Sequence, residues 1–394
     1  MKKLNILDLT WLMLDNADQK MNISFVFMFQ KPTNYSDHYI TDLVQDIRAH
    51  PWPLPHYNEK PYRSLLTLGR YVWKRDLINV DMRHHVKLVQ IPGNRSINDL
   101  RKFIVNEQAK PFDYSRPLWE ICVVDGLEDK KQFAIIYKAH HCSIDGISLV
   151  NLLTELFKIN PSDQSNPDMI SKINGQRHKH RKTNKLGRWN WIKGYLKGLN
   201  TVLKNIKSGE TMLIPPKGAV PTTRFNAVVN TKRSFATVEI PLSEVKELCG
   251  IADCTINDML SAFIGTALSR YLNEKGEPQD KSLYAAMPVS IHTDDDMDES
   301  NKLATSCYPL ASHIENAQEK IALIKAATTK GKMEIKLLPK EVIYSLIGVG
   351  LIPIIIKKIS GVRSVNPTRM TNVMISNVPF FKETRYYKGS KLLS

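Results

Sequence analysis

The sequence predicts a mixed α/β (α+β) protein of two domains joined by a long basic crossover that contains one helix. Three observations lead to this fold class. Runs rich in β-branched and aromatic residues, typical of strands, alternate with helix-like stretches in both halves of the chain. The order of these elements is similar in the two halves. Between the halves lies a strongly basic stretch that ends in prolines, so the predicted ranges are 1–160, 161–221 and 222–394.

The first half carries strand and helix signals in turn. Gly126 and Asp129 mark a hairpin-like turn between its last two strand-like runs. Ser96 is a suitable N-cap for the second of its two helices. Strands are expected at Ile23–Gln30, Pro117–Leu127 and Lys131–His141, and helices at Asp42–His50 and Ser96–Lys110.

The second half repeats this mixture. A helix is expected to start at Ser243 and to stop at Gly250, because glycine readily ends a helix. A second helix is expected at Thr255–Asn273. Strands are expected at Ser234–Leu242, Ser282–Ile291 and Thr371–Pro379.

The net charge of +16 is concentrated in the crossover. Eleven lysines and arginines, and no acidic residue, lie between Asp168 and Glu210. Charge gathered in this way indicates a partner surface. Apolar residues recur here at intervals of three and four, which predicts an amphipathic helix with lysines on its other face. Candidate membrane contacts are Trp189, Lys193, Lys197, Lys204 and Lys207. The alternative is that the apolar face packs across both domains as an internal tie.

Cysteine usage and the N-terminus indicate a reducing compartment. The five cysteines are widely spread and form no C-x-x-C pair, so neither a disulfide framework nor a zinc site is suggested. The opening residues imitate a signal peptide, but Asp8 and Asp15 break the apolar run, and no small-residue cleavage site follows. We expect a cytoplasmic protein that binds no metal.

Two further classes are disfavoured. The most apolar stretch, Val342–Ile356, is too short to span a bilayer and contains Pro353. We expect a buried core helix there, with partial insertion into one membrane leaflet as the alternative. Nucleic-acid binding would use the basic crossover, but its aromatic residues lie on an amphipathic helix rather than on a sheet suited to base stacking. We therefore expect no nucleic-acid partner.

The chemistry centres on the sequence KAHHCSIDGISL, which places His140 and His141 at the end of an apolar strand. A strand that delivers a histidine into a loop exposes the imidazole while the scaffold fixes its position. Histidine titrates near neutral pH, so it can accept a proton from an attacking hydroxyl and return it to a leaving group. Asp145 can brace the loop, and Gly146 allows a turn that a Cβ would obstruct. This H-H-x-x-x-D-G pattern is the candidate catalytic site.

A second pair of histidines, His84 and His85, lies in the sequence VDMRHHVKL. It lacks the Asp-Gly partner. A histidine next to a strand is more often a satisfied core residue than a catalytic one, and we expect that role here.

The H-H-x-x-x-D-G pattern is the signature of CoA-dependent acyltransferases, which include chloramphenicol acetyltransferase-like enzymes and the condensation domains of peptide synthetases. Its flanks resemble one branch, the bacterial wax ester synthase/diacylglycerol acyltransferase family. The opening LDLTWLMLDNADQKMNI is similar to that family's first helix and strand, and the resemblance covers essentially the whole chain. The further motifs that carry it are Pro117-Leu118-Trp119-Glu120, Thr255-Ile256-Asn257-Asp258, Pro288-Val289-Ser290 and Ser376-Asn377-Val378-Pro379.

The resemblance implies an enzyme that moves a fatty acyl group from acyl-CoA to a long-chain alcohol or a diacylglycerol, forming wax ester or triacylglycerol. His141 would deprotonate the alcohol, His140 would support the geometry, and Asp145 would hold the loop. Two chloramphenicol acetyltransferase-like domains would enclose the active site in a tunnel, with CoA entering from one face and the alcohol from the other. Asn257 would lie near this tunnel, and Asn377 would shape its CoA side.

The resemblance also implies that no cofactor is needed, because acyl-CoA is a substrate. Peripheral contact with an anionic membrane, on its inner face, or with a lipid droplet would bring the enzyme to its acceptors and products. Two alternatives stay open. One is a non-catalytic membrane-surface or lipid-droplet protein derived from this family, and the other is a peptide-synthetase-like condensation enzyme.

The sequence departs from the family pattern at two places. Phe380-Phe381 replaces the Gly-Pro that usually follows S-N-V-P, so that turn must be built differently. The chain also stops at GSKLLS, where family members continue through further strands and a final helix. We therefore expect the second domain to be incomplete in the chain as given.

Overall fold

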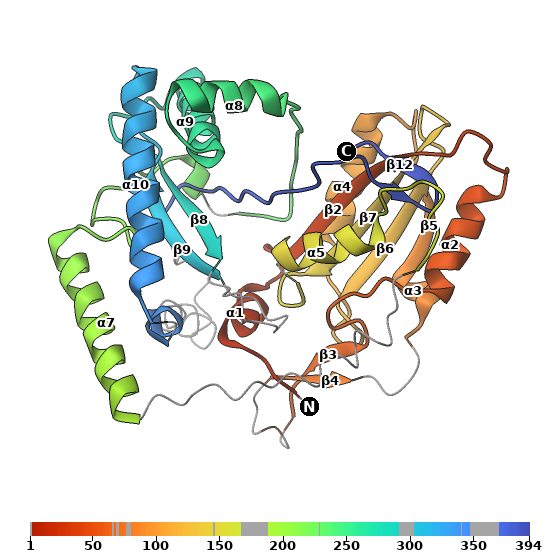
Figure 1. Ribbon diagram of the computed structural model, residues 1–394, viewed down its shortest axis with the longest axis horizontal. Coiled ribbons are helices and arrows are strands. Elements are labelled where there is room, and N and C mark those ends of the chain that lie inside the picture. The colour runs from red at the N-terminus through yellow and green to blue at the C-terminus, as the bar shows by residue number, and fades with distance from the viewer. Residues whose placement is uncertain are drawn as a thin grey trace.

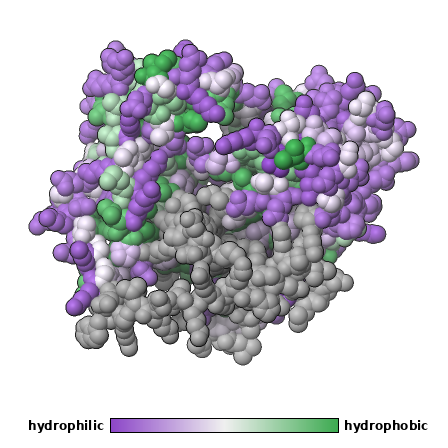
Figure 2. Space-filling view, in the orientation of Figure 1, coloured by the Kyte–Doolittle hydropathy of each residue, from purple (hydrophilic) through white to green (hydrophobic). Residues whose placement is uncertain are grey.

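The described residues form a larger six-stranded sheet in one half of the molecule, a smaller three-stranded sheet in the other half, and a further short sheet near the N-terminus (Figure 1). The computed structural model describes residues 2–64, 67, 71–75, 80–144, 146–166, 188–227, 229–290, 303–339, 341–346 and 370–394. Helix α1 (Ile6–Leu14) lies between the two halves. Ahead of it, β1 (Lys2–Lys3) pairs with β4 (Val72–Arg75) in a small sheet that also contains β3 (Glu59–Tyr62). The coloured part of the face seen in Figure 2 is mainly hydrophilic, with some apolar residues among the hydrophilic ones.

The larger sheet has six strands in the order β11-β12-β2-β7-β6-β5. Strands β2, β7 and β6 pair antiparallel, and β5 runs parallel to β6. The three strands expected in the first half are confirmed as β2, β6 and β7. The bounds are β2 Asn22–Gln30, β5 Val86–Gln90, β6 Trp119–Asp125, β7 Gln132–His140, β11 Tyr386–Tyr387 and β12 Ser390–Leu392.

Helices cover both faces of this sheet because alternate strand residues point to opposite sides. On one face Phe27, Phe133 and Tyr137 pack with residues of α2 and α5. On the other face Ala134 and Ile136 pack with residues of α4. The bounds are α2 Tyr39–Ala49, α3 Met82–His85, α4 Ile97–Ala109 and α5 Gly146–Leu156.

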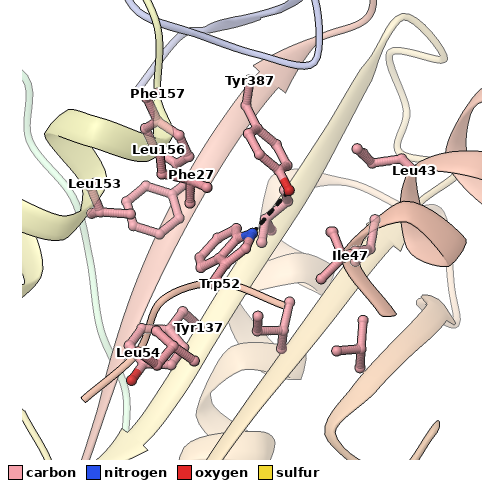
Figure 3. Packing of buried hydrophobic residues seen from close by; sticks show 14 of the residues in the cluster. Phe27, Leu43, Ile47, Trp52, Leu54, Tyr137, Leu153, Leu156, Phe157 and Tyr387 are labelled. Atoms are coloured by element: carbon pink, nitrogen blue, oxygen red, sulfur yellow. Dashed lines mark hydrogen bonds between the residues drawn. The ribbon is translucent and has the colours of Figure 1, made fainter. Parts of the chain in front are cut away.

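The C-terminal strands complete the sheet of the N-terminal half. Strand β12 pairs antiparallel with β2, and β11 pairs with β12. In the core beside them, the Trp52 indole N–H donates a buried hydrogen bond of 2.9 Å to the Tyr387 hydroxyl (Figure 3). The Phe381 ring, in the segment where the family pattern departs, lies 6.0 Å from the Phe157 ring. The range 222–394 therefore contributes to both sheets, and the division into three ranges stays a prediction.

The smaller sheet has the order β10-β8-β9. Helices α9 and α10 pack on its core through Met259, Leu272 and Ile324. A capping box of Thr255 and Asp258 starts α9, as one of Ser96 and Asp99 starts α4. The bounds are α8 Leu242–Ile251, α9 Ile256–Glu274, β8 Tyr284–Ser290, β9 Leu303–Pro309, α10 Ala317–Leu337 and β10 Val373–Met374.

Three details of the second half differ from expectation. The strand expected at Thr371–Pro379 forms only over the two residues of β10. The strand expected at Ser234–Leu242 is wrong, because no strand forms there. These residues are exposed, and Val238 is 83% accessible, so no neighbouring strand completes the alternating pattern. Helix α8 also continues past Gly250 and ends at Ile251.

The amphipathic helix of the crossover is confirmed as α7 (Arg188–Ser208). One side of it is buried, because Val202 packs in a cluster with Ile335 and Val342, and the Tyr195 hydroxyl donates to Ser345 Oγ at 3.1 Å. Another side stays open, since Leu196 and Leu203 are 57% and 56% accessible. The contacts of α7 are thus with residues of the second half, and an apolar edge of the helix stays exposed; packing across both domains stays a prediction.

The apolar stretch that begins at Val342 is described only as far as residue 346. Val342 and Ile343 are buried, in agreement with the expected core helix; residues 347–356 lie outside the described part. Among the described residues, no single helix has both the length and the apolar composition to cross a bilayer. Helices α8 and α9 reach that length and composition only when they are taken together, and the angle between them is 97°.

Candidate active site

Strand β7, which lies inside the larger sheet, ends at His140, and His141 follows directly after it. The backbone N–H of His141 donates to the carbonyl of Met21 at 2.8 Å, which ties the end of β7 to the loop before β2. The His140 N–H donates to Leu118, in the P-L-W-E motif, at 3.0 Å. Backbone bonds on both sides thus fix the position from which the His141 side chain extends.

The His140 ring is fully buried and has defined partners. Its Nδ1 accepts the backbone N–H of Cys142 at 3.2 Å, so the ring proton lies on Nε2. That nitrogen is 3.3 Å from a carboxylate oxygen of Asp15 and 3.2 Å from the Tyr114 hydroxyl. These contacts occupy both ring nitrogens of a buried side chain, and the role of His140 in the geometry of the site stays a prediction.

Asp15 is a site residue that the sequence analysis missed. Burial raises its pKa, but hydrogen bonds from His140 and from the Met21 N–H, together with the charge of Lys20, outweigh burial and hold the pKa below its usual value. The carboxylate therefore stays ionised and joins His140 to the loop that carries Met21. The only signal in the sequence was an aspartate that interrupts an apolar run.

Trp11 was also missed. Its indole ring, on α1, stacks on the His141 imidazole with centroids 4.0 Å apart and planes inclined by 14°. Helix α1 thus reaches both histidines, through this stack and through Asp15, which follows its last residue. Trp11 belongs to the N-terminal sequence LDLTWLMLDNADQKMNI, which resembles the family's first helix and strand. This resemblance was the signal in the sequence that could have indicated Trp11.

Gly146 begins α5 directly beside the S-N-V-P motif. A Cβ added at Gly146 would lie 3.0 Å from Cγ2 of Val378. The absence of a Cβ therefore allows Val378 to pack closely here, whereas the sequence analysis expected glycine to allow a turn. Gly146 is not among the residues with a positive φ. The contact brings together two motifs that lie far apart in the sequence.

A cavity of about 550 Å³ opens beside His141. One wall is the loop Gln19–Asn22, and the other is formed by residues between Arg224 and Ser234, which lead into the second half of the chain. The cavity therefore lies between segments from both halves. A hydroxyl or thioester group bound there would be within reach of the imidazole.

The other predicted site residues lie away from the cavity beside His141 or outside the described residues. Asp145 lies outside the described residues. Asn257 is in the first turn of α9, where its side-chain amide donates to the sulfur of Met287 at 2.8 Å, and Asn377 is exposed. Neither asparagine lines the cavity beside His141, so their substrate roles stay predictions. His85 has the expected core role: burial lowers its pKa, and its Nδ1–H donates to the carbonyl of Trp119 at 2.6 Å.

The predicted membrane contacts lie on α7. The side chains of Lys193, Lys197, Lys204 and Lys207 are exposed, and that of Trp189 lies outside the described part. No group of three or more histidine, cysteine, aspartate or glutamate side chains within the described ranges could hold a metal ion.

Comparisons with known proteins show what the chain is similar to. Residues 4–260 match the family model of the wax ester synthase/diacylglycerol acyltransferase catalytic domain. The chain is 28% identical to the O-acyltransferase WSD of Acinetobacter baylyi over 403 residues, covering all of this chain and 85% of that protein. The solved wax ester synthase/diacylglycerol acyltransferase of Marinobacter aquaeolei VT8 is 25% identical, with a TM-score of 0.72 over 100% of this chain and 86% of that one.

A more distant likeness concerns the fold alone. The first condensation domain of the calcium-dependent antibiotic synthetase aligns with a TM-score of 0.57 at 11% identity, covering 100% of this chain and 83% of that one. Together with the Marinobacter structure, it confirms the predicted two-domain chloramphenicol acetyltransferase-like fold.

Proposed function

Because the chain belongs to the wax ester synthase/diacylglycerol acyltransferase family, we propose that it transfers a fatty acyl group from acyl-CoA to the hydroxyl of a long-chain alcohol or a diacylglycerol. The observation that carries this proposal is the position of His141. Its ring stacks on Trp11 at the wall of a cavity between the two halves of the chain. A fixed imidazole at a cavity is the arrangement that general-base catalysis requires.

His141 acts as the base. It takes the proton of the acceptor hydroxyl while the oxygen attacks the thioester carbonyl carbon. The tetrahedral intermediate then collapses, the carbon–sulfur bond breaks, and the imidazolium returns the proton to the CoA thiolate. The products are an ester and free CoA, so atoms and charge balance. The pair of buried His140 and partly buried Asp15 takes no part in proton transfer and holds the loop on which His141 depends.

The test is to incubate purified protein with palmitoyl-CoA and either hexadecanol or dioleoylglycerol, and to measure free CoA and lipid esters. His141→Ala should lower ester formation by about 10²–10⁴-fold, the usual contribution of a general base. His50→Ala is the matched control, because His50 is an exposed histidine directly after the last residue of α2, where it pairs with Asp46. Ester formation by His141→Ala at the parent rate would contradict the assignment.

Peripheral docking on an anionic membrane or lipid droplet is the second part of the proposal. It is supported by the exposed edge of α7, where Leu196 and Leu203 lie beside four exposed lysines. Basic residues near an anionic leaflet contribute about 1 kcal/mol each, and apolar side chains inserted at the interface add to this. The surface would bring the enzyme to its water-insoluble acceptors.

Liposome flotation tests the docking. Binding should rise with the fraction of anionic lipid, fall with added salt, and weaken when Lys193, Lys197, Lys204 and Lys207 become Gln. The control variant loses the same number of charges elsewhere on the surface. In it, four exposed lysines become Gln: Lys102, Lys130, Lys131 and Lys246. Equal flotation of the two quadruple variants would show that α7 does not dock the protein.

A further inference from the structure

The cavity beside His141 has an unusual charge. Lys20, Arg224, Lys232 and Arg233 all line it, and none of its described lining residues is an aspartate or a glutamate. Two of these charges are already paired. Lys20 lies 3.4 Å from Asp15, and Arg224 lies 2.7 Å from Glu277. Lys232 and Arg233 have no carboxylate in salt-bridge contact within the described ranges, so the mouth of the cavity carries a net positive charge, although Asp18 lines the adjoining cavity.

Arg233 is held in place without being neutralised. Its guanidinium donates to the carbonyl of Asp18 at 2.9 Å, and to the carbonyls of Asn230 and Lys232. Carbonyl oxygens fix the orientation of a guanidinium but leave its full charge available to an anion. The bond to Asp18 also fastens the segment that carries Arg233 to the loop that carries Met21, and Met21 in turn holds His141.

A second cavity continues from this point. It has a volume of about 380 Å³, and it shares Lys20, Arg233 and Ser234 with the cavity beside His141. Its walls include apolar side chains of β2 and α4, among them Val26 and Ile104. The cations thus lie at the junction between the catalytic cavity and a partly apolar recess.

Only one of the two proposed substrates carries anionic groups. Long-chain alcohols and diacylglycerols are uncharged, whereas CoA has a diphosphate and a 3′-phosphate at its nucleotide end. We infer that Lys232 and Arg233, assisted by Lys20, bind the phosphates of acyl-CoA, an inference that rests on the proposed function. This mouth of the site is therefore the donor entrance. The pantetheine arm runs from these cations toward His141, the adenosine lies over the adjoining recess, and the alcohol arrives from another direction.

Donors that differ only in their phosphates test this inference. We compare palmitoyl-CoA, palmitoyl-dephospho-CoA, which lacks the 3′-phosphate, and S-palmitoyl-pantetheine, which lacks every phosphate. For the parent, KM should be lowest for palmitoyl-CoA. In the Lys232→Gln/Arg233→Gln double variant, KM for palmitoyl-CoA should rise about ten- to a hundredfold with little change in kcat, as expected for lost charge-assisted hydrogen bonds. The ratio of KM between the phosphate-free donor and palmitoyl-CoA should fall toward one.

Matched variants separate charge from structure. Arg101, on α4, is a cation that donates a hydrogen bond to Thr237, a few residues after Arg233, and it lines neither cavity. Arg101→Gln should therefore leave the KM ratio at the parent value. Arg233→Lys keeps the charge and should retain most of the ratio. Lys232→Gln alone alters an exposed side chain, so it reports on phosphate binding even if Arg233→Gln does not fold.

Two results would overturn the inference. One is a double variant whose KM rises equally for all three donors, because the phosphates would then not be recognised here. The other is a double variant that binds free CoA as tightly as the parent in isothermal titration calorimetry. Failure of the proposed function is distinguishable, since the parent would then transfer palmitate from none of the donors, while the calorimetric comparison would still report on CoA binding.

Discussion

The indole of Trp11 and the imidazole of His141 are stacked 4.0 Å apart, although 130 residues separate them in the sequence. The stack places α1 against the end of β7 and limits rotation of the imidazole. Asp15, at the end of the same helix, holds the neighbouring His140. One short helix therefore positions both histidines, although it contributes no group to the proton transfer itself.

Replacing Trp11 with Ala should lower kcat about tenfold, because an aromatic pair contributes about 0.5–1.5 kcal/mol beyond its buried area. Trp11→Phe keeps an aromatic face against His141 and should restore most of kcat. The measurement is steady-state kinetics with palmitoyl-CoA and hexadecanol. Equal kcat values for the Ala and Phe variants would show that stacking does not position the imidazole.

Asp15→Asn should destabilise the protein at neutral pH by about 1–3 kcal/mol, because partly buried hydrogen bonds to a charged acceptor are weakened. The folded-state pKa of Asp15 lies below its usual 3.8, so the stabilisation is present above about pH 3.8 and is lost as pH falls through the lower folded value. The melting-temperature difference between parent and variant should be constant down to about pH 4 and shrink below it. Asp18→Asn, in the same loop but exposed, is the control. A difference independent of pH would contradict this account.

Gly146→Ala should lower both stability and activity, since the added Cβ would lie 3.0 Å from Val378 and packed contacts of this kind cost about 1–3 kcal/mol. Val378→Ala removes the obstructing methyl groups. The double variant should therefore recover part of the loss, giving a coupling free energy of about 1 kcal/mol in a double-mutant cycle. Chemical denaturation of the four proteins provides the measurement, and additive losses would refute the contact.

Tyr387→Phe should destabilise the protein by about 1–3 kcal/mol because it leaves the buried indole N–H of Trp52 without its acceptor. Tyr386→Phe is the matched control on the neighbouring position of β11, where the side chain is only partly buried. Urea denaturation would show the difference. A loss for Tyr386→Phe as large as that for Tyr387→Phe would mean that the hydrogen bond is not the cause.

Local signals in the sequence predicted the strands that carry the site and the starts of two helices. The apolar run before His141 could be only a buried strand, and Ser96 and Thr255 are caps whose partners lie three residues away. Contacts between distant residues were not predictable in this way. Nothing local marks Asp15 as the partner of His140, or the short β12 as a neighbour of β2.

The strand expected at 234–242 failed for a related reason. An alternating pattern shows that a segment can form a strand, but a strand also requires a partner, and the pattern does not identify one. Lys232 and Arg233 lie just before that segment, and their position at the His141 cavity depends on the path of the chain between the two halves. The sequence analysis placed the concentrated positive charge in the crossover and did not single them out.

The pairing of β12 with β2 has a consequence for the order in which the protein folds. Trp52 and Tyr387 are 335 residues apart, so the N-terminal sheet cannot close its β2 edge until almost the whole described chain has left the ribosome. Until then β2 presents unpaired backbone groups, which can pair with other nascent chains and promote aggregation. Contacts of such long sequence separation also slow folding. Synthesis of this chain should therefore depend on chaperones that shield the β2 edge during translation.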